Sequence, residues 1–226
     1  LNLGFDAWGP FYPDPNPETN TVDGRVFRTG EIATWAAIHD AVDGTGSGDV
    51  NASDSTPYIT SSATANRWEN IIRSFFLFDT SSIDDAATID TATLSVKHFG
   101  KVDDFTQSLR IVTSTPALDT ALGIADYDQL GTVAQANDIT IASTTNDVYN
   151  DFTFNATGIS NISKTGVSKF GERITADADN SEPTYVASKN SGVGTYFADE
   201  AGVTSDPKLS GTTAAAGTTW LGKRWG

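Results

Sequence analysis

The chain contains no cysteine, which excludes a disulfide scaffold, cysteine-ligated zinc sites and a thiol nucleophile. It also contains no methionine, and basic residues are scarce, with 14 Lys and Arg against 29 Asp and Glu and a net charge of −15. A field this negative repels phosphate backbones, so we expect no nucleic-acid partner. No apolar run approaches the roughly 18 residues of a transmembrane helix, so we expect no membrane span.

Glutamate is rare as well, because the acidic excess consists of 23 Asp and only 6 Glu. Asp, Thr, Ser, Asn and Gly favour turns and strands, while good surface helix formers are few. A length of 226 residues suits one large all-β domain. The composition therefore predicts a β-rich chain with many loops.

Both ends of the chain differ in composition from its middle. Residues 1–21 interleave prolines with aromatic residues, which predicts an extended N-terminal arm. Residues 211–226 read as a Gly/Thr/Ala linker followed by a tail rich in Trp and basic residues. Trp and Arg are typical anchors of protein interfaces, so we expect both segments to bind partners. The predicted partner-binding residues are Phe5, Trp8, Phe11, Tyr12, Trp220, Leu221, Arg224 and Trp225.

Residues 22–210 carry the strand signals of a jelly roll or β-sandwich of about eight or nine strands. The strongest signals are IIRSFFLFD at 71–79 and the alternating segment 90–100, to which we expect 108–114 to pair. The other expected strands are 22–28, 138–143, 148–157, 167–174, 183–188 and 194–200. One short helix is expected within 31–42, and a mobile loop at 43–56.

The segment RSFFLFDTSSIDDAATIDTATLSV resembles the opening of DNRLRE-type jelly-roll domains, which are carbohydrate-binding-like. The matching residues are Arg73, Leu77, Phe78, Asp79, Ser81, Ile83, Ile89, Ala92, Leu94 and Val96. A second block resembles later strands of that family, at Thr157, Ile159, Phe170, Gly171, Ala198, Glu200, Pro207 and Leu209. The segments at residues 11–30 and 34–41, followed by FDTSSI at 78–83, also resemble uncharacterised proteins from phage and environmental sequence sets. The resemblance implies a jelly roll in a secreted surface module, some relatives of which bind polysaccharide.

No catalytic motif accompanies these signals. The only two histidines, His39 and His98, lie on different elements without G-x-S-x-G or H-E-x-x-H spacing. His98 has the parity of the buried positions of its strand, and Arg73 interrupts an apolar strand and must reach water or a carboxylate. We therefore expect no enzyme activity.

The many carboxylates of the chain could serve as calcium ligands, because calcium takes 6–8 oxygen ligands. The loop ADADNSE brings Asp177, Asp179 and Glu182 close in sequence and is the candidate calcium site, with ordinary solvated turn residues as the alternative. Sugar binding requires exposed aromatic faces, for which Trp35, Trp68, Tyr127 and Tyr185 are candidates, although the position of Trp35 on the helical stretch favours core packing.

Two functions from different classes fit these observations. The favoured one is a non-enzymatic structural subunit of an extracellular assembly, such as a virion capsid, decoration layer or fibre, or a surface filament. Its terminal segments would bind copies of itself or other subunits. The alternative is a secreted or virion-borne carbohydrate-binding or adhesion module that contains structural calcium.

Overall fold

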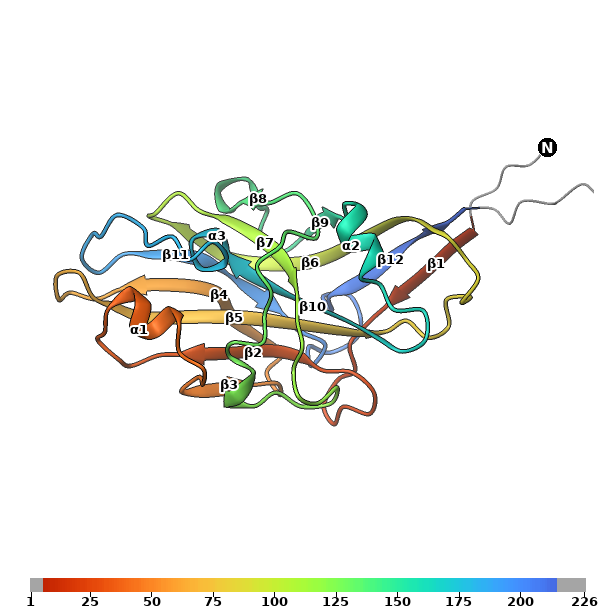
Figure 1. Ribbon diagram of the computed structural model, residues 1–226, viewed down its shortest axis with the longest axis horizontal. Helices are drawn as coiled ribbons and strands as arrows, with labels where there is room; N and C mark the ends of the chain where they lie inside the picture. The colour runs from red at the N-terminus through yellow and green to blue at the C-terminus, as the bar shows by residue number, and fades with distance from the viewer. Residues whose placement is uncertain (1–5, 215–226) are drawn as a thin grey trace, which may run out of the picture.

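The computed structural model describes residues 6–214, which form an all-β jelly roll or β-sandwich (Figure 1). Twelve strands are present in this part of the chain. Their bounds are β1 Asp6–Phe11, β2 Asp23–Arg28, β3 Gly46–Gly48, β4 Ser53–Ser61, β5 Trp68–Asp79, β6 Ile89–Asp103, β7 Ser108–Thr113, β8 Ile139–Thr140, β9 Tyr149–Thr153, β10 Val167–Ile174, β11 Asn190–Tyr196 and β12 Lys208–Thr213. Three short helices accompany them: α1 Trp35–His39, α2 Ala156–Ser160 and α3 Thr175–Ala178. The predicted fold class is confirmed.

The strands form a curled antiparallel sheet with the order β1-β12-β6-β11-β4-β5-β10-β7-β8. β2 and β3 extend it beside β5, and β9 pairs with the first half of β6. The first and last strands are therefore neighbours, because Asp6 lies opposite Thr213 in the register of β1 and β12.

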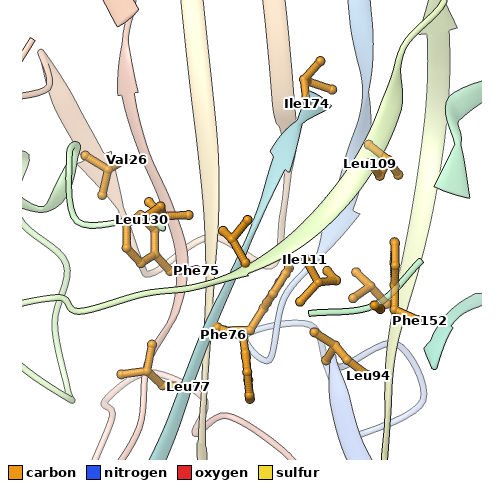
Figure 2. Close-up of a cluster of buried hydrophobic side chains, with 14 of the residues drawn as sticks. Val26, Phe75, Phe76, Leu77, Leu94, Leu109, Ile111, Leu130, Phe152 and Ile174 are labelled. Carbon is orange, nitrogen blue, oxygen red and sulfur yellow. The ribbon is translucent and has the colours of Figure 1, made fainter. Parts of the chain in front are cut away.

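The hydrophobic core follows the strongest patterns in the sequence. Every residue of β5 from Ile71 to Phe78 is buried, as expected for a strand covered on both faces. β6 instead alternates, with Ala92, Leu94, Val96 and His98 buried, as its sequence predicts. Figure 2 shows the result, in which side chains from β2, β5, β6, β7, β9 and β10 meet in one cluster.

Several expected elements differ in the structure. The segment 108–114 does not pair with 90–100, because β7 lies between β10 and β8. The helix is limited to Trp35–His39, since only Trp35 and Ile38 face the core while Ile32 and Val42 are exposed. Residues 183–188 form no strand.

The predicted boundaries of the domain are also too narrow. Residues 6–11 belong to the sheet as β1, so an arm covering all of 1–21 is wrong for this part. The segment 43–56 contains β3 and the start of β4 instead of a continuous loop. β12 crosses the predicted boundary at residue 210 and continues to Thr213.

Candidate functional site

Two of the aromatic residues near the N-terminus that are predicted to bind partners, Trp8 and Phe11, pack on their own domain. Trp8 stacks on Phe11 with ring centroids 5.9 Å apart, and both side chains lie against the hydrophobic core. Gly211 of β12 leaves room for the Trp8 indole, because a Cβ at that position would collide with the ring. Tyr12 lines a cleft that is described below. The other predicted partner-binding residues, Phe5, Trp220, Leu221, Arg224 and Trp225, lie outside the described residues.

β1 is the edge strand at the end of the sheet. It pairs only with β12, so one row of its backbone groups has no strand partner within residues 6–214. A cleft of about 460 Å³ adjoins this edge, lined by Trp8 and Asp6, by the 82–88 loop and by Thr213. The indole Nε1 of Trp8 is buried and has no hydrogen-bond partner in the described part of the chain. An unpaired strand edge is a template on which another chain can pair, so this edge is a candidate interface.

Each of the three predicted calcium ligands contacts a different side chain of its own chain. Asp177 is 1 % exposed and lies between two arginines, Arg73 of β5 and Arg173 of β10. Arg73 donates to it through Nε at 3.0 Å and Nη2 at 2.7 Å, and Arg173 through Nε at 2.7 Å. Burial raises the pKa of this carboxyl, but the charges of Arg73 and Arg173 outweigh burial and hold the pKa well below its usual range.

The other two predicted ligands are engaged elsewhere. Asp179 forms an ion pair with Arg110, and Glu182 Oε1 accepts a hydrogen bond from Trp68 Nε1 at 2.8 Å. Among residues 6–214, no group of three or more His, Asp or Glu side chains is arranged to hold a metal ion. The structure therefore does not bring Asp177, Asp179 and Glu182 together as a calcium site.

Three of the four aromatic residues considered for sugar binding are in the core. Trp35, Trp68 and Tyr127 are buried, and only Tyr185 is half-exposed. The expected core packing of Trp35 is confirmed, because its ring lies edge-on to Trp68 at 5.0 Å between centroids. Tyr127 is held by Arg73, whose guanidinium carbon lies 4.0 Å from the centre of its ring.

A different set of aromatic side chains shares the outer face of β4, β11 and β6. Tyr58 lies over Gly192 and Phe99 over Gly194, since a Cβ at either glycine would collide with the ring. Tyr196 joins Phe99 with 4.9 Å between ring centroids, and its hydroxyl donates to Asp147 at 3.0 Å. All three rings are partly exposed. We call this set the aromatic face.

The sequence of β11 contains a signal for the aromatic face. Two glycines alternate with the buried Val193 in β11, so both belong to its outer side. Such positions leave room for rings from neighbouring strands, but which rings fill them depends on strand pairing.

A second cleft, of about 400 Å³, lies between residues 12–15 and 198–206. Asp14, Asp199, Glu200 and Asp206 line it together with Tyr12, and no Lys or Arg does. Burial raises the pKa of Asp206 to about 6, and the charges of Glu200 and Asp199 act in the same direction. We call this site the acidic cleft.

Both histidine side chains contact groups of their own chain. His98 of β6 and Glu172 of β10 are both fully buried, with 3.3 Å between Nε2 and Oε2. His39 Nε2 lies 2.7 Å from the carbonyl oxygen of Asp177. The predicted burial of His98 is confirmed, and of the two partners expected for Arg73, water or a carboxylate, the structure shows the carboxylate of Asp177.

Comparison with known protein families gives no matching family model, and comparison with curated proteins gives no matching sequence. The resemblance to DNRLRE-type domains therefore stays a prediction. Within residues 6–214, no helix combines the length and the apolar character needed to cross a membrane.

Proposed function

We propose that the protein is a non-enzymatic structural subunit of an extracellular assembly, such as a virion shell or fibre or a surface filament. The observation that carries this proposal is the meeting of both ends of the domain at the β1 edge. Asp6 and Thr213 lie opposite each other, and Ala214 donates its backbone N–H to the carbonyl of Thr88 at 2.8 Å. The two ends of the described chain, Asp6 and Ala214, therefore both line the 460 Å³ cleft beside the open edge.

This arrangement would allow identical subunits to bind one another's terminal segments. A neighbour that offers the same edge presents an unpaired strand on which a segment of its partner can pair. Trp220 and Trp225 supply the aromatic anchors that interfaces favour.

The proposal predicts that assembly depends on these tryptophans. We expect the wild-type chain to sediment as an oligomer, and the full-length variant Trp220→Ser/Trp225→Ser as a monomer, at the same concentration. Analytical ultracentrifugation measures the mass, and circular dichroism checks that the sheet is intact. The matched control is Tyr185→Ser, which removes a half-exposed aromatic ring outside the lining of the β1 cleft and should leave assembly unchanged. The idea is wrong if the double variant assembles like the wild type.

The aromatic face favours a second candidate function, a carbohydrate-binding or adhesion module. The apolar faces of sugar rings stack on aromatic rings, and polar groups at the margin orient the hydroxyls. Asp147 at Tyr196, and Asp104, which accepts from the Asn190 backbone N–H at 3.1 Å, provide such groups. Aromatic rings over glycines also stabilise a sheet without any ligand, which is the competing explanation.

Substitution of the exposed rings separates these explanations. We expect Phe99→Ala and Tyr196→Ala to weaken binding to a polysaccharide by tenfold or more on a glycan array or in affinity electrophoresis. Phe27→Ala, on β2 and outside this face, serves as the control and leaves binding unchanged, because Phe27 is likewise a half-buried ring that lies over a glycine, Gly46. If the wild type binds no glycan, while both alanine variants lose stability, the rings have only the sheet-covering role.

A further inference from the structure

The acidic cleft contains carboxylate oxygens that the domain itself leaves without partners. Asp206 is 3 % exposed, yet its Oδ1 has no hydrogen-bond partner within residues 6–214. The Oδ2 of Asp199 is buried and lacks a partner in the same way, while its Oδ1 accepts from the Asn16 backbone N–H. Buried polar atoms are nearly always satisfied, so these two oxygens point to a missing donor.

The missing donor carries positive charge. No basic side chain lines the acidic cleft, and the raised pKa of Asp206 reflects burial beside other carboxylates. Burial raises the pKa of Asp23 as well, with the charges of Asp199 and Asp206 adding to the effect. A cation in the cleft would relieve this repulsion. Guanidinium and ammonium groups form short, charge-assisted hydrogen bonds with such carboxylates.

Within residues 6–214, every Lys and Arg side chain already has a contact outside this cleft. Of the 14 Lys and Arg residues, all those within residues 6–214 already contact a carboxylate, a carbonyl or hydroxyl oxygen, or an aromatic ring of their own chain. The two that remain are Lys223 and Arg224, which lie outside the described residues.

We propose that the acidic cleft binds the Lys223–Arg224 pair of a second copy of this chain. The guanidinium of Arg224 pairs with the free oxygens of Asp199 and Asp206, and the ring of Tyr12 offers it a cation–π face. This inference rests on the proposed function, for which it names one contact between subunits.

The position of the cleft favours a second copy over the same molecule. Asp206 precedes β12 and Ala214 follows it, so the cleft and the end of the described chain lie at opposite ends of this strand. The tail would have to return along about 20 Å of strand to reach its own cleft. Both edges of β12 are already occupied, by β1 and by β6.

A peptide-binding experiment on the full chain tests the proposal. The receptor is the full-length variant Lys223→Gln/Arg224→Gln, whose own tail is neutral, and the probe is a fluorescent peptide of residues 217–226. We expect binding at pH 7.5 in low salt, measured by fluorescence anisotropy, and loss of binding when the peptide carries the same two glutamines. Adding Asp199→Asn or Asp206→Asn to the receptor should weaken binding by tenfold or more. Asp90→Asn, an exposed carboxylate of β6 outside the cleft, is the matched control and should change nothing.

Acidification gives an independent readout. Because the pKa of Asp206 is about 6, lowering the pH from 7.5 to 5 protonates this carboxyl and should weaken binding in the parent receptor. The Asp206→Asn receptor should show a smaller dependence on pH over this range.

Three outcomes overturn the inference. The first is a peptide that fails to bind, and the second is equal binding to the cleft variants and to the control. The third is a wild-type chain that sediments as a monomer although the peptide binds, since the tail then occupies its own molecule. Failure of the proposed function is distinguished by the tryptophan variants, because a chain that assembles through them while the peptide ignores the cleft keeps the proposed function and loses only this contact.

Discussion

Asp177→Asn should lower the free energy of unfolding by about 3–5 kcal/mol, because it leaves two buried arginines without their shared counter-charge. Arg73 is 2 % exposed and Arg173 is 4 % exposed, so water cannot replace the lost carboxylate in the folded state. The loss is a large share of the roughly 5–15 kcal/mol that stabilises a typical domain. Urea denaturation measures it as a lower midpoint at unchanged slope.

Asp179→Asn provides the matched control. It lies two residues away and also pairs with an arginine, Arg110, but its side chain is 53 % exposed. Exposed pairs contribute about 0–1 kcal/mol, so this variant should remain close to the wild type. Equal losses in the two variants would show that the buried arrangement of Arg73, Asp177 and Arg173 has no special weight.

The same carboxylate makes stability depend on pH in a defined direction. The pKa of Asp177 is lower in the folded state, so its contribution is fully present above the unfolded value of about 4. It is lost as the pH falls from that value through the lower folded-state pKa, because the unfolded chain then takes up a proton while the two arginines keep the folded carboxylate ionised. The difference between the wild type and Asp177→Asn should therefore shrink below about pH 4.

His98→Leu should have the second large effect on stability. The substitution leaves Glu172 fully buried without the imidazole that contacts its Oε2, and an unsatisfied buried polar group costs about 1–3 kcal/mol or more. Glu172→Leu should also lower the free energy of unfolding, since it leaves the buried Nε2 of His98 without its partner. The double variant His98→Leu/Glu172→Leu removes both polar groups, and replacement of a whole buried pair by apolar residues is often close to neutral.

A double-mutant cycle from urea denaturation at pH 7 gives the coupling between the two side chains. We expect the double variant to be more stable than His98→Leu alone. Additive losses would mean that the 3.3 Å contact carries no coupling and that the space between β6 and β10 sets the cost.

The parts of the fold that could be predicted from sequence are those whose signal is local. The continuous apolar run of β5 and the alternation in β6 are properties of adjacent residues, and both strands occur where expected. The local sequence of β12 does not indicate a strand, because only Leu209 of its residues is buried. Its strand conformation depends on pairing with residues more than a hundred positions away.

The candidate sites follow the same division. Nothing near Asp177 in sequence indicates that Arg73 will bury it, so a loop rich in carboxylates could not be distinguished from a metal site. The acidic cleft likewise joins residues 12–15 to 198–206, and the aromatic face draws on three strands. Residue types could suggest carboxylate or aromatic chemistry, but only strand pairing decides which groups meet.

The adjacency of Asp6 and Thr213 has a consequence for longer chains that carry this domain. When the chain enters and leaves a domain at neighbouring points, the domain projects to one side of the longer chain. The chain does not run through such a domain from one end to the other. Such a domain can be inserted into a surface loop of a host protein with little disturbance of the host. Mechanical tension on the host chain would then act locally, on β1 and β12, and would separate β1 from β12 before it loaded the core around β5.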